Sequence, residues 1–170
     1  MRLFAERGFA ATTGAMIAAE AATTERTYYR HFKDKADVAF GDEERLQLLL
    51  SNGVRDAPSQ SSGWLSMVHG LNSLATDIGE RRAEFERRAT VVEANVELRD
   101  RERARAAMWT SVAQLALIAR GIDAATAYRS AAIGMTCFGV ALQEWFGHPG
   151  ESLPSTLNKV LTEIRMDLQG

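Results

Sequence analysis

The stretch "TTERTYYRHFKDKADV", residues 23–38, joins three aromatic rings and a histidine to four Lys/Arg side chains. Tyr28 and Phe32 are four positions apart, so in a helix both rings lie on the same face. Arg26 and Thr27 then fall on the opposite face. The pattern predicts a short helix with an apolar back and an aromatic, cationic front.

Threonine and aspartate residues mark the expected helix starts around this stretch, because their side-chain oxygens accept hydrogen bonds from the free amides of a first turn. Thr13 and Thr24 predict two short helices, over residues 13–21 and 24–32, separated by a tight turn. Asp34 predicts the start of a longer helix. Two short helices that cross at a tight turn form a helix-turn-helix, whose second helix enters the major groove of DNA.

Helical periodicity continues through almost the whole chain, and no convincing alternation of period two is present. The predicted fold class is all-α, with about nine helices and an N-terminal helix-turn-helix. The stretch "SNGVRDAPSQSSG", residues 51–63, is predicted to be a linker by its Gly, Ser and Pro content. The other helices are predicted over residues 3–8, 34–50, 64–78, 82–94, 98–120, 124–146 and 155–168.

The composition sets limits on the class of protein. A net charge of -2 excludes a chain that is basic overall, although residues 1–40 carry six Arg/Lys against five Asp/Glu. One cysteine, Cys137, excludes an internal disulfide and suits a reducing compartment. No apolar stretch approaches the roughly 20 residues that cross a bilayer. The start "MRLFAERGF" does not have the form of a signal peptide. A cytoplasmic location is therefore expected.

The front of the second short helix carries groups that suit DNA. Arg26, near its tip, matches the O6 and N7 acceptors of guanine in a two-pronged contact. Thr27 suits a thymine methyl group or a phosphate, and the other polar groups suit phosphate oxygens. Free amides at the helix starts near Thr13 and Asp34 are further anion sites. The predicted DNA-binding residues are Thr13, Thr24, Arg26, Thr27, Tyr29, His31, Lys33 and Lys35.

Three segments, "LFAERGFAATT", "IAAEA" and "TERTYYRHFKDKADV", follow one another at a family's characteristic spacing. Over about residues 3–40 the chain resembles regulators of the tetracycline-repressor (TetR) family. The resemblance implies a DNA-binding domain over residues 1–40 and a helical ligand-binding and dimerisation domain over residues 41–170. The positions that match the family's DNA contacts are Arg26, Thr27 and Tyr29 for base reading, and Thr13, Tyr29, His31 and Lys35 for phosphates.

Three features depart from the family pattern. The turn between the short helices reads Ala22-Thr23 where glycine and a small aliphatic residue are usual, and a left-handed Ala22 is strained by about 1–2 kcal/mol. Gly14 replaces a branched aliphatic residue and weakens its helix by about 1 kcal/mol relative to alanine. The first helix is short, so we expect it to be truncated or the natural chain to begin upstream of Met1. These departures bear on DNA affinity more than on the fold.

The last two helices are the expected dimer contact. Small residues in "AATAYRSAAIGMTCFGVALQEWF" allow close helix approach, and Leu157, Leu161 and Leu168 lie on one apolar face of the last helix. A twofold homodimer through these helices would place two recognition helices about one DNA turn apart.

A cavity for a small apolar effector is predicted among the middle helices, since methionine and tryptophan together suit adaptable pockets. Plain core packing remains the alternative for each residue. The effector is expected to change the separation of the recognition helices and release the operator, although activation is not distinguished from repression. No cofactor or metal site is predicted. The predicted ligand-binding residues are Trp64, Met67, Val68, Leu71, Phe85, Val92, Met108, Trp109, Val112 and Phe138.

Two rival functions remain open. A helical enzyme is disfavoured because the three histidines are far apart in sequence and no nucleophile-elbow or phosphate-loop motif is present. The closer rival is a TetR-like small-molecule sensor, or a partner-binding protein, with weakened DNA binding. Gly14 and the Ala22-Thr23 turn motivate that alternative.

Overall fold

The computed structural model describes residues 1–167, and within this range every regular element is helical. This confirms the all-α prediction, with ten helices in place of about nine. The helices are α1 (Arg2–Arg7), α2 (Gly14–Glu20), α3 (Glu25–His31), α4 (Lys35–Ala39), α5 (Glu43–Asp56), α6 (Gly63–Glu80), α7 (Arg82–Glu93), α8 (Val96–Ala119), α9 (Ala124–Gly147) and α10 (Leu153–Asp167).

The helices form two compact units. The first unit contains Met1–Glu43 together with Arg82–Ala104, and the second contains Glu44–Arg81 together with the chain from Arg105 onward. The helices α7 and the start of α8 therefore pack with the N-terminal helices, although about forty residues separate them in sequence. The division of function at residue 40 stays a prediction.

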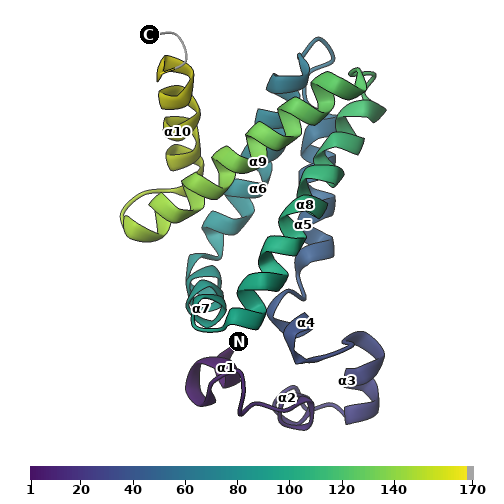
Figure 1. The fold of residues 1–170 in the computed structure, drawn as a ribbon, viewed down its shortest axis with the longest axis vertical. Coiled ribbons are helices and arrows are strands. Elements are labelled where there is room, and N and C mark those ends of the chain that lie inside the picture. Colours follow the sequence, from purple (N-terminus) through teal and green to yellow (C-terminus); the bar gives the residue numbers. More distant parts are fainter. Residues whose placement is uncertain (168–170) are drawn as a thin grey trace. The chain divides into compact units, whose positions relative to one another are not determined.

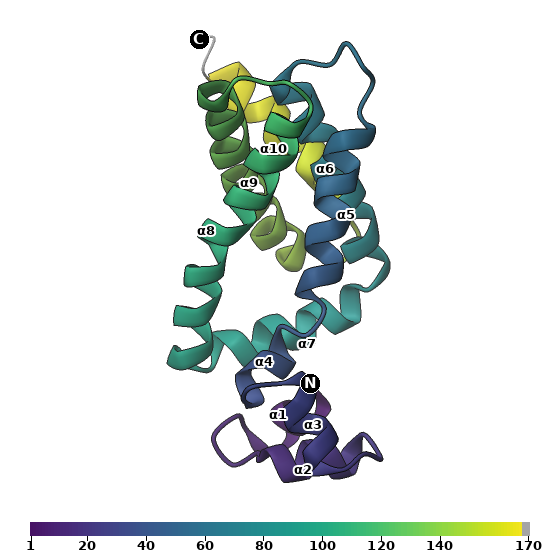
Figure 2. The same cartoon turned by 90° about the vertical axis from the view of Figure 1, so that its right-hand side faces the viewer.

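The first unit has its own apolar core. Helix α1 packs on α7, and α1, α2 and α3 gather into one cluster, as Figure 2 shows. The guanidinium of Arg88 lies over the ring of Phe40, 4.9 Å from its centroid, and so closes one side of this core. The buried residues of the cluster are Phe4, Phe9, Ala36, Ala39, Phe40, Val91, Val92 and Leu98.

The second unit is built around mutual contacts of α6, α9 and α10. In Figure 1, α9 runs diagonally across α6, and α10 stands to the left. Small residues allow these helices to approach closely. A Cβ added at Gly134 on α9 would lie 2.7 Å from Cγ of Met67 on α6, so Met67 fills the space between the two helices. Trp145 is fully buried, and its indole Nε1 donates to the Glu151 carbonyl at 2.9 Å.

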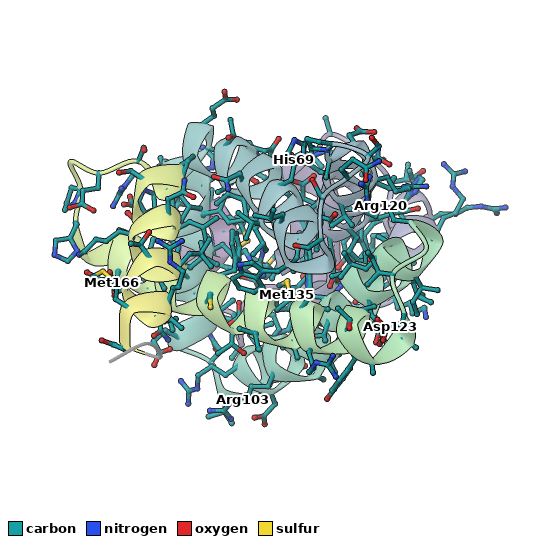
Figure 3. All side chains as sticks on the ribbon, turned by 90° about the horizontal axis from the view of Figure 1, so that it is seen from above. His69, Arg103, Arg120, Asp123, Met135 and Met166 are labelled. Carbon is teal, nitrogen blue, oxygen red and sulfur yellow. The ribbon has the colours of Figure 1, made fainter. Side chains whose placement is uncertain are left out.

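Helix α8 is fastened at its C-terminal end to the loop that follows α5. The Arg120 guanidinium donates to the carbonyl oxygens of Arg55 and Pro58, the latter at 2.8 Å. Figure 3 shows Arg120 and Asp123 toward the right of the view, where α8 ends and α9 begins. Asp123 caps α9 by accepting from the Thr126 amide at 3.0 Å, as the sequence predicted.

Two predicted boundaries were wrong. The single helix predicted over residues 34–50 is divided into α4 and α5. Helix α4 ends at Ala39, because its C-cap Phe40 has φ of -119°, outside the helical region, and Gly41 follows. The linker predicted over residues 51–63 begins only after Asp56, and its first part belongs to α5. Gly53 is buried there against α6, so its small size serves helix packing and not chain flexibility.

The last helix begins at Leu153, two residues before the predicted start, and continues to Asp167. Its predicted apolar face is buried at Leu157 and Val160, while Leu168 lies outside the described residues. Within residues 1–167, none of the helices combines the length and the apolar character that crossing a bilayer requires.

Candidate nucleic-acid interface

The two short helices begin where the sequence predicted. The Thr13 hydroxyl accepts from the Met16 amide at 3.2 Å, and the Thr24 hydroxyl accepts from the Thr27 amide at 3.2 Å. Each threonine thus satisfies one amide of the first turn that has no partner within its helix. The ring of Tyr28 is buried on the back of α3, as its spacing indicated.

The turn between α2 and α3 contains the strained residue that the sequence predicted. Ala22 has φ of +50°, and no other non-glycine residue among the described ones has positive φ. The Thr23 amide donates to the Ala18 carbonyl at 2.9 Å and the Ala22 amide donates to the Ala19 carbonyl at 3.1 Å. This pair of bonds is a Schellman ending, whose left-handed position is normally glycine. The turn therefore closes α2 in the Schellman geometry with alanine at the position that is normally glycine.

Replacing Ala22 by glycine is expected to raise the free energy of unfolding by about 1 kcal/mol, because glycine has no Cβ to clash in the left-handed conformation. Chemical denaturation at fixed protein concentration measures this change. The matched control is Ala19→Gly, at an exposed position of α2 with helical geometry, where a loss of about 1 kcal/mol is expected. Equal losses in both variants would contradict a left-handed Ala22.

The Gly14 departure is explained by the two tyrosines of α3. A Cβ added at Gly14 would lie 2.7 Å from Cε1 of Tyr28 and 2.8 Å from the hydroxyl oxygen of Tyr29. The two rings meet edge to face, with centroids 4.9 Å apart. Aromatic rings from α3 therefore occupy the volume that a branched side chain on α2 would fill, and a larger residue at position 14 would require these rings to move.

The front of α3 is open to solvent. Arg26, Tyr29 and Arg30 are exposed, with Tyr29 at 56 % of its full accessible surface. Thr27 is half-buried, and its hydroxyl oxygen accepts from the Thr24 hydroxyl at 3.1 Å. The structure thus brings together most of the predicted reading residues on one exposed helix face, and His31 and Lys33 are exposed where α3 ends.

Lys35 has a contact set that the sequence did not predict. Its ammonium group donates to the carbonyl oxygens of Phe9 at 2.7 Å, Ala10 at 3.1 Å and Thr12 at 3.2 Å. It also lies over the Phe9 ring, 4.5 Å from the centroid. An ammonium has three N–H donors, so three carbonyls use all of them. Lys35 therefore holds the loop between α1 and α2, and its phosphate contact stays a prediction that requires one of these bonds to open.

The turn between α3 and α4 is held by two carboxylates. Oδ1 of Asp34 accepts from the amides of Ala36 at 2.8 Å and Asp37 at 3.1 Å, which caps α4 as predicted. Oδ2 of Asp37 accepts from the Lys33 amide at 2.9 Å. The remaining oxygen of each carboxylate faces the guanidinium of Arg101, on α8.

Arg101 was missed by sequence reasoning because it is remote in the chain and belongs to a run of alternating charges typical of a solvated helix face. Arg101 helps to lower the pKa of the Asp34 carboxyl. Burial alone would raise the pKa of the Asp34 carboxyl, but the hydrogen bond from Arg101 and those from the α4 amides outweigh burial. Together they hold that pKa below its ordinary value.

The residues predicted to bind a ligand are divided between the units. Phe85 and Val92 lie on α7 in the first unit, where Val92 is part of the apolar core, and the other eight belong to the second unit. Met67, Leu71 and Phe138 are buried in close packing, whereas Met108 is 52 % exposed. The first unit contains cavities of about 180 and 220 Å³, and Phe85 lines the smaller one. The predicted ligand site stays a prediction.

The model of the family described as bacterial regulatory proteins, tetR family, matches residues 1–40 of the chain. The matched segment contains α1, α2, α3 and α4, and so includes the complete helix-turn-helix. No curated protein matches the chain.

Proposed function

We propose that this chain, a DNA-binding transcriptional regulator of the tetR family by its N-terminal domain, is a homodimeric repressor released from its operator by a small apolar molecule. The observation that carries the DNA-binding part is the single exposed face of α3, on which Arg26, Tyr29 and Arg30 stand while Tyr28 is buried behind them. Because its exposed and buried residues lie on different faces, α3 can enter a groove of DNA while Tyr28 stays packed in the protein. Operator binding would place the protein in the cytoplasm.

Eight polar residues of the helix-turn-helix and the turn after it have proposed roles on DNA. Arg26 reads a guanine, and Thr27 contacts a thymine methyl group or a phosphate. The remaining proposed contacts position the protein on the phosphates and carry no sequence information. They are Thr13, Thr24, His31, Lys33 and Lys35, while Tyr29 is proposed to contact both a base and a phosphate.

The proposed dimer uses α9 and α10, as in a four-helix seam between two subunits. Apolar side chains that α9 exposes support this choice: Ile133 is 50 % exposed and Val140 is 38 % exposed. Thr136 and Gly139 lie between them at helical spacing and leave room for a close helix approach. A twofold dimer presents the same α3 face twice, which a two-half-site operator requires.

The proposed effector site is among Trp64, Met67, Val68, Leu71 and Trp109 and the other apolar residues predicted with them. The bound molecule would favour one separation of the two recognition helices over another. Release of the operator then requires that the effector bind these two states with different affinity.

The deciding experiment is a gel shift of the wild-type protein on the DNA upstream of its own coding sequence, with an unrelated duplex of equal length as the control. A repressor should prefer the upstream DNA by a factor on the order of a thousand or more, and its affinity should fall steeply with salt. Sedimentation should give a dimer. Weak binding with no preference between the duplexes would favour the rival function, a sensor that has lost tight DNA binding.

A further inference from the structure

We propose that Arg101, on α8, is a positioning residue for the recognition helix, because it locks the turn between α3 and α4 from outside the helix-turn-helix. The inference rests on the proposed function and adds to it a residue that lies beyond the segment matched to the tetR family. Arg101 and the turn belong to the same compact unit.

One guanidinium serves two carboxylates of the turn. Nη2 of Arg101 lies 2.5 Å from Oδ2 of Asp34, and Nη1 lies 3.5 Å from Oδ1 of Asp37. The planar guanidinium fork can reach both acids at once, which a lysine ammonium would do less well. Glu97, one turn earlier on α8, is 3.8 Å from Nη2 and is the third acid beside the guanidinium.

The carboxylate oxygens that face Arg101 are the ones that do not accept the hydrogen bonds from backbone amides described above. Asp34 gives Oδ1 to the first amides of α4, and Asp37 gives Oδ2 to the amide of Lys33. Removing the guanidinium would leave these two neighbouring carboxylates without the positive charge that both of them contact. Their repulsion would act directly on the bonds that hold the Lys33 amide and the start of α4.

This turn determines where α3 ends. The bond from the Lys33 amide to Asp37 lies two residues after His31, the last residue of α3. The proposed phosphate contacts at His31 and Lys33 are beside it. A turn that loosens would therefore let the cationic end of α3 move relative to α4 while leaving the reading residues themselves unchanged.

Arg101→Met tests the proposal, because methionine keeps much of the apolar stem and removes the charge. Arg103→Met is the matched control on the same helix. The Arg103 side chain projects away from the ribbon in Figure 3, is 76 % exposed and pairs only weakly with Asp100 on its own helix. Circular dichroism checks that both variants fold. Arg101→Lys, which retains the charge without the fork, should give an intermediate effect.

In Arg101→Met we expect binding to the upstream duplex to weaken about fivefold, with the salt dependence unchanged, since Arg101 does not itself contact DNA. NMR should show the Asp34 carboxyl pKa rising toward its ordinary value and faster amide exchange at Ala36 and Asp37. Arg103→Met should leave all of these unchanged. Lys33→Ala provides the contrast, because loss of a phosphate contact should reduce the salt slope by about one unit.

Two outcomes would overturn the positioning role. Unchanged DNA affinity together with unchanged amide exchange in Arg101→Met would show that the contacts of Arg101 with Asp34 and Asp37 do not hold the turn in place. A salt slope reduced as in Lys33→Ala would make Arg101 a DNA contact instead. If the wild-type protein binds neither duplex, the proposed function fails, while the Asp34 pKa and the exchange rates still decide whether Arg101 holds the turn.

Discussion

Gly70→Ala is expected to lower the free energy of unfolding by about 2–3 kcal/mol, because α5 and α6 touch at this position. An added Cβ would lie 2.5 Å from Cγ2 of Val54, 2.9 Å from the Leu50 carbonyl oxygen and 3.0 Å from the Val54 amide nitrogen. Two of these three atoms belong to the α5 backbone, which cannot move aside without shifting the helix. From the other side, a Cβ on Gly53 would meet the Cα of Gly70 at 2.9 Å.

The matched control is Gly79→Ala in the same helix. Its added Cβ would find only ordinary contacts, at 3.8 Å from Leu153 and Pro154. Alanine is the better helix former, so this variant should be unchanged or more stable by up to about 1 kcal/mol. Urea denaturation at one fixed protein concentration compares the two variants, since dimerisation would make the midpoint depend on concentration. A Gly70→Ala protein as stable as Gly79→Ala would mean that α5 and α6 do not meet at Gly70.

The second large effect is expected from Arg26→Ala, which removes the proposed guanine contact. Binding to the upstream duplex should weaken by about 1–3 kcal/mol, which corresponds to about five- to 150-fold. The loss should be specific, because Arg26 is proposed to read one base pair. The variant should therefore tolerate substitutions at that base pair that the wild-type protein rejects. Titration of the wild-type duplex and of duplexes with single base-pair changes measures both effects.

Arg87→Ala is the control for charge alone, since it removes an exposed guanidinium from α7 in the same compact unit. It should leave base discrimination intact. If Arg26→Ala weakens binding equally for every duplex, Arg26 grips a phosphate and the proposed readout is wrong. Stability should change little in either variant, because both side chains are exposed.

Much of the fold was predictable because its determinants are local. Thr13, Thr24, Asp34 and Asp123 each cap the helix that the sequence assigned to them. The strain at Ala22 was also predictable, since the turn pattern requires a left-handed residue at that position. Capping and turn geometry depend on residues within about one helical turn, so a short stretch of sequence is enough to predict them.

The candidate DNA-binding site was predictable in part. The exposed front and buried back of α3 follow from helical periodicity, and the structure places Arg26 and Tyr29 as that periodicity indicated. The bonding of Lys35 was not predictable, because a lysine after a capping aspartate gives no sign that three carbonyls of a distant loop surround it. The same holds for Arg101, whose two partners in the turn between α3 and α4 are more than sixty positions away.

The sequence by itself determined most of the helices, their caps and the division of α3 into two faces, because hydrogen bonding and side-chain direction within a helix depend on near neighbours. Only the tertiary structure decided what Gly53 and Gly14 are for. In the sequence, Gly53 resembles a linker residue and Gly14 a residue that weakens its helix. In the structure, atoms of another helix occupy the space beside each of them. Close packing between segments that are distant in sequence determines the residue size at such positions, so a local sequence pattern cannot predict it.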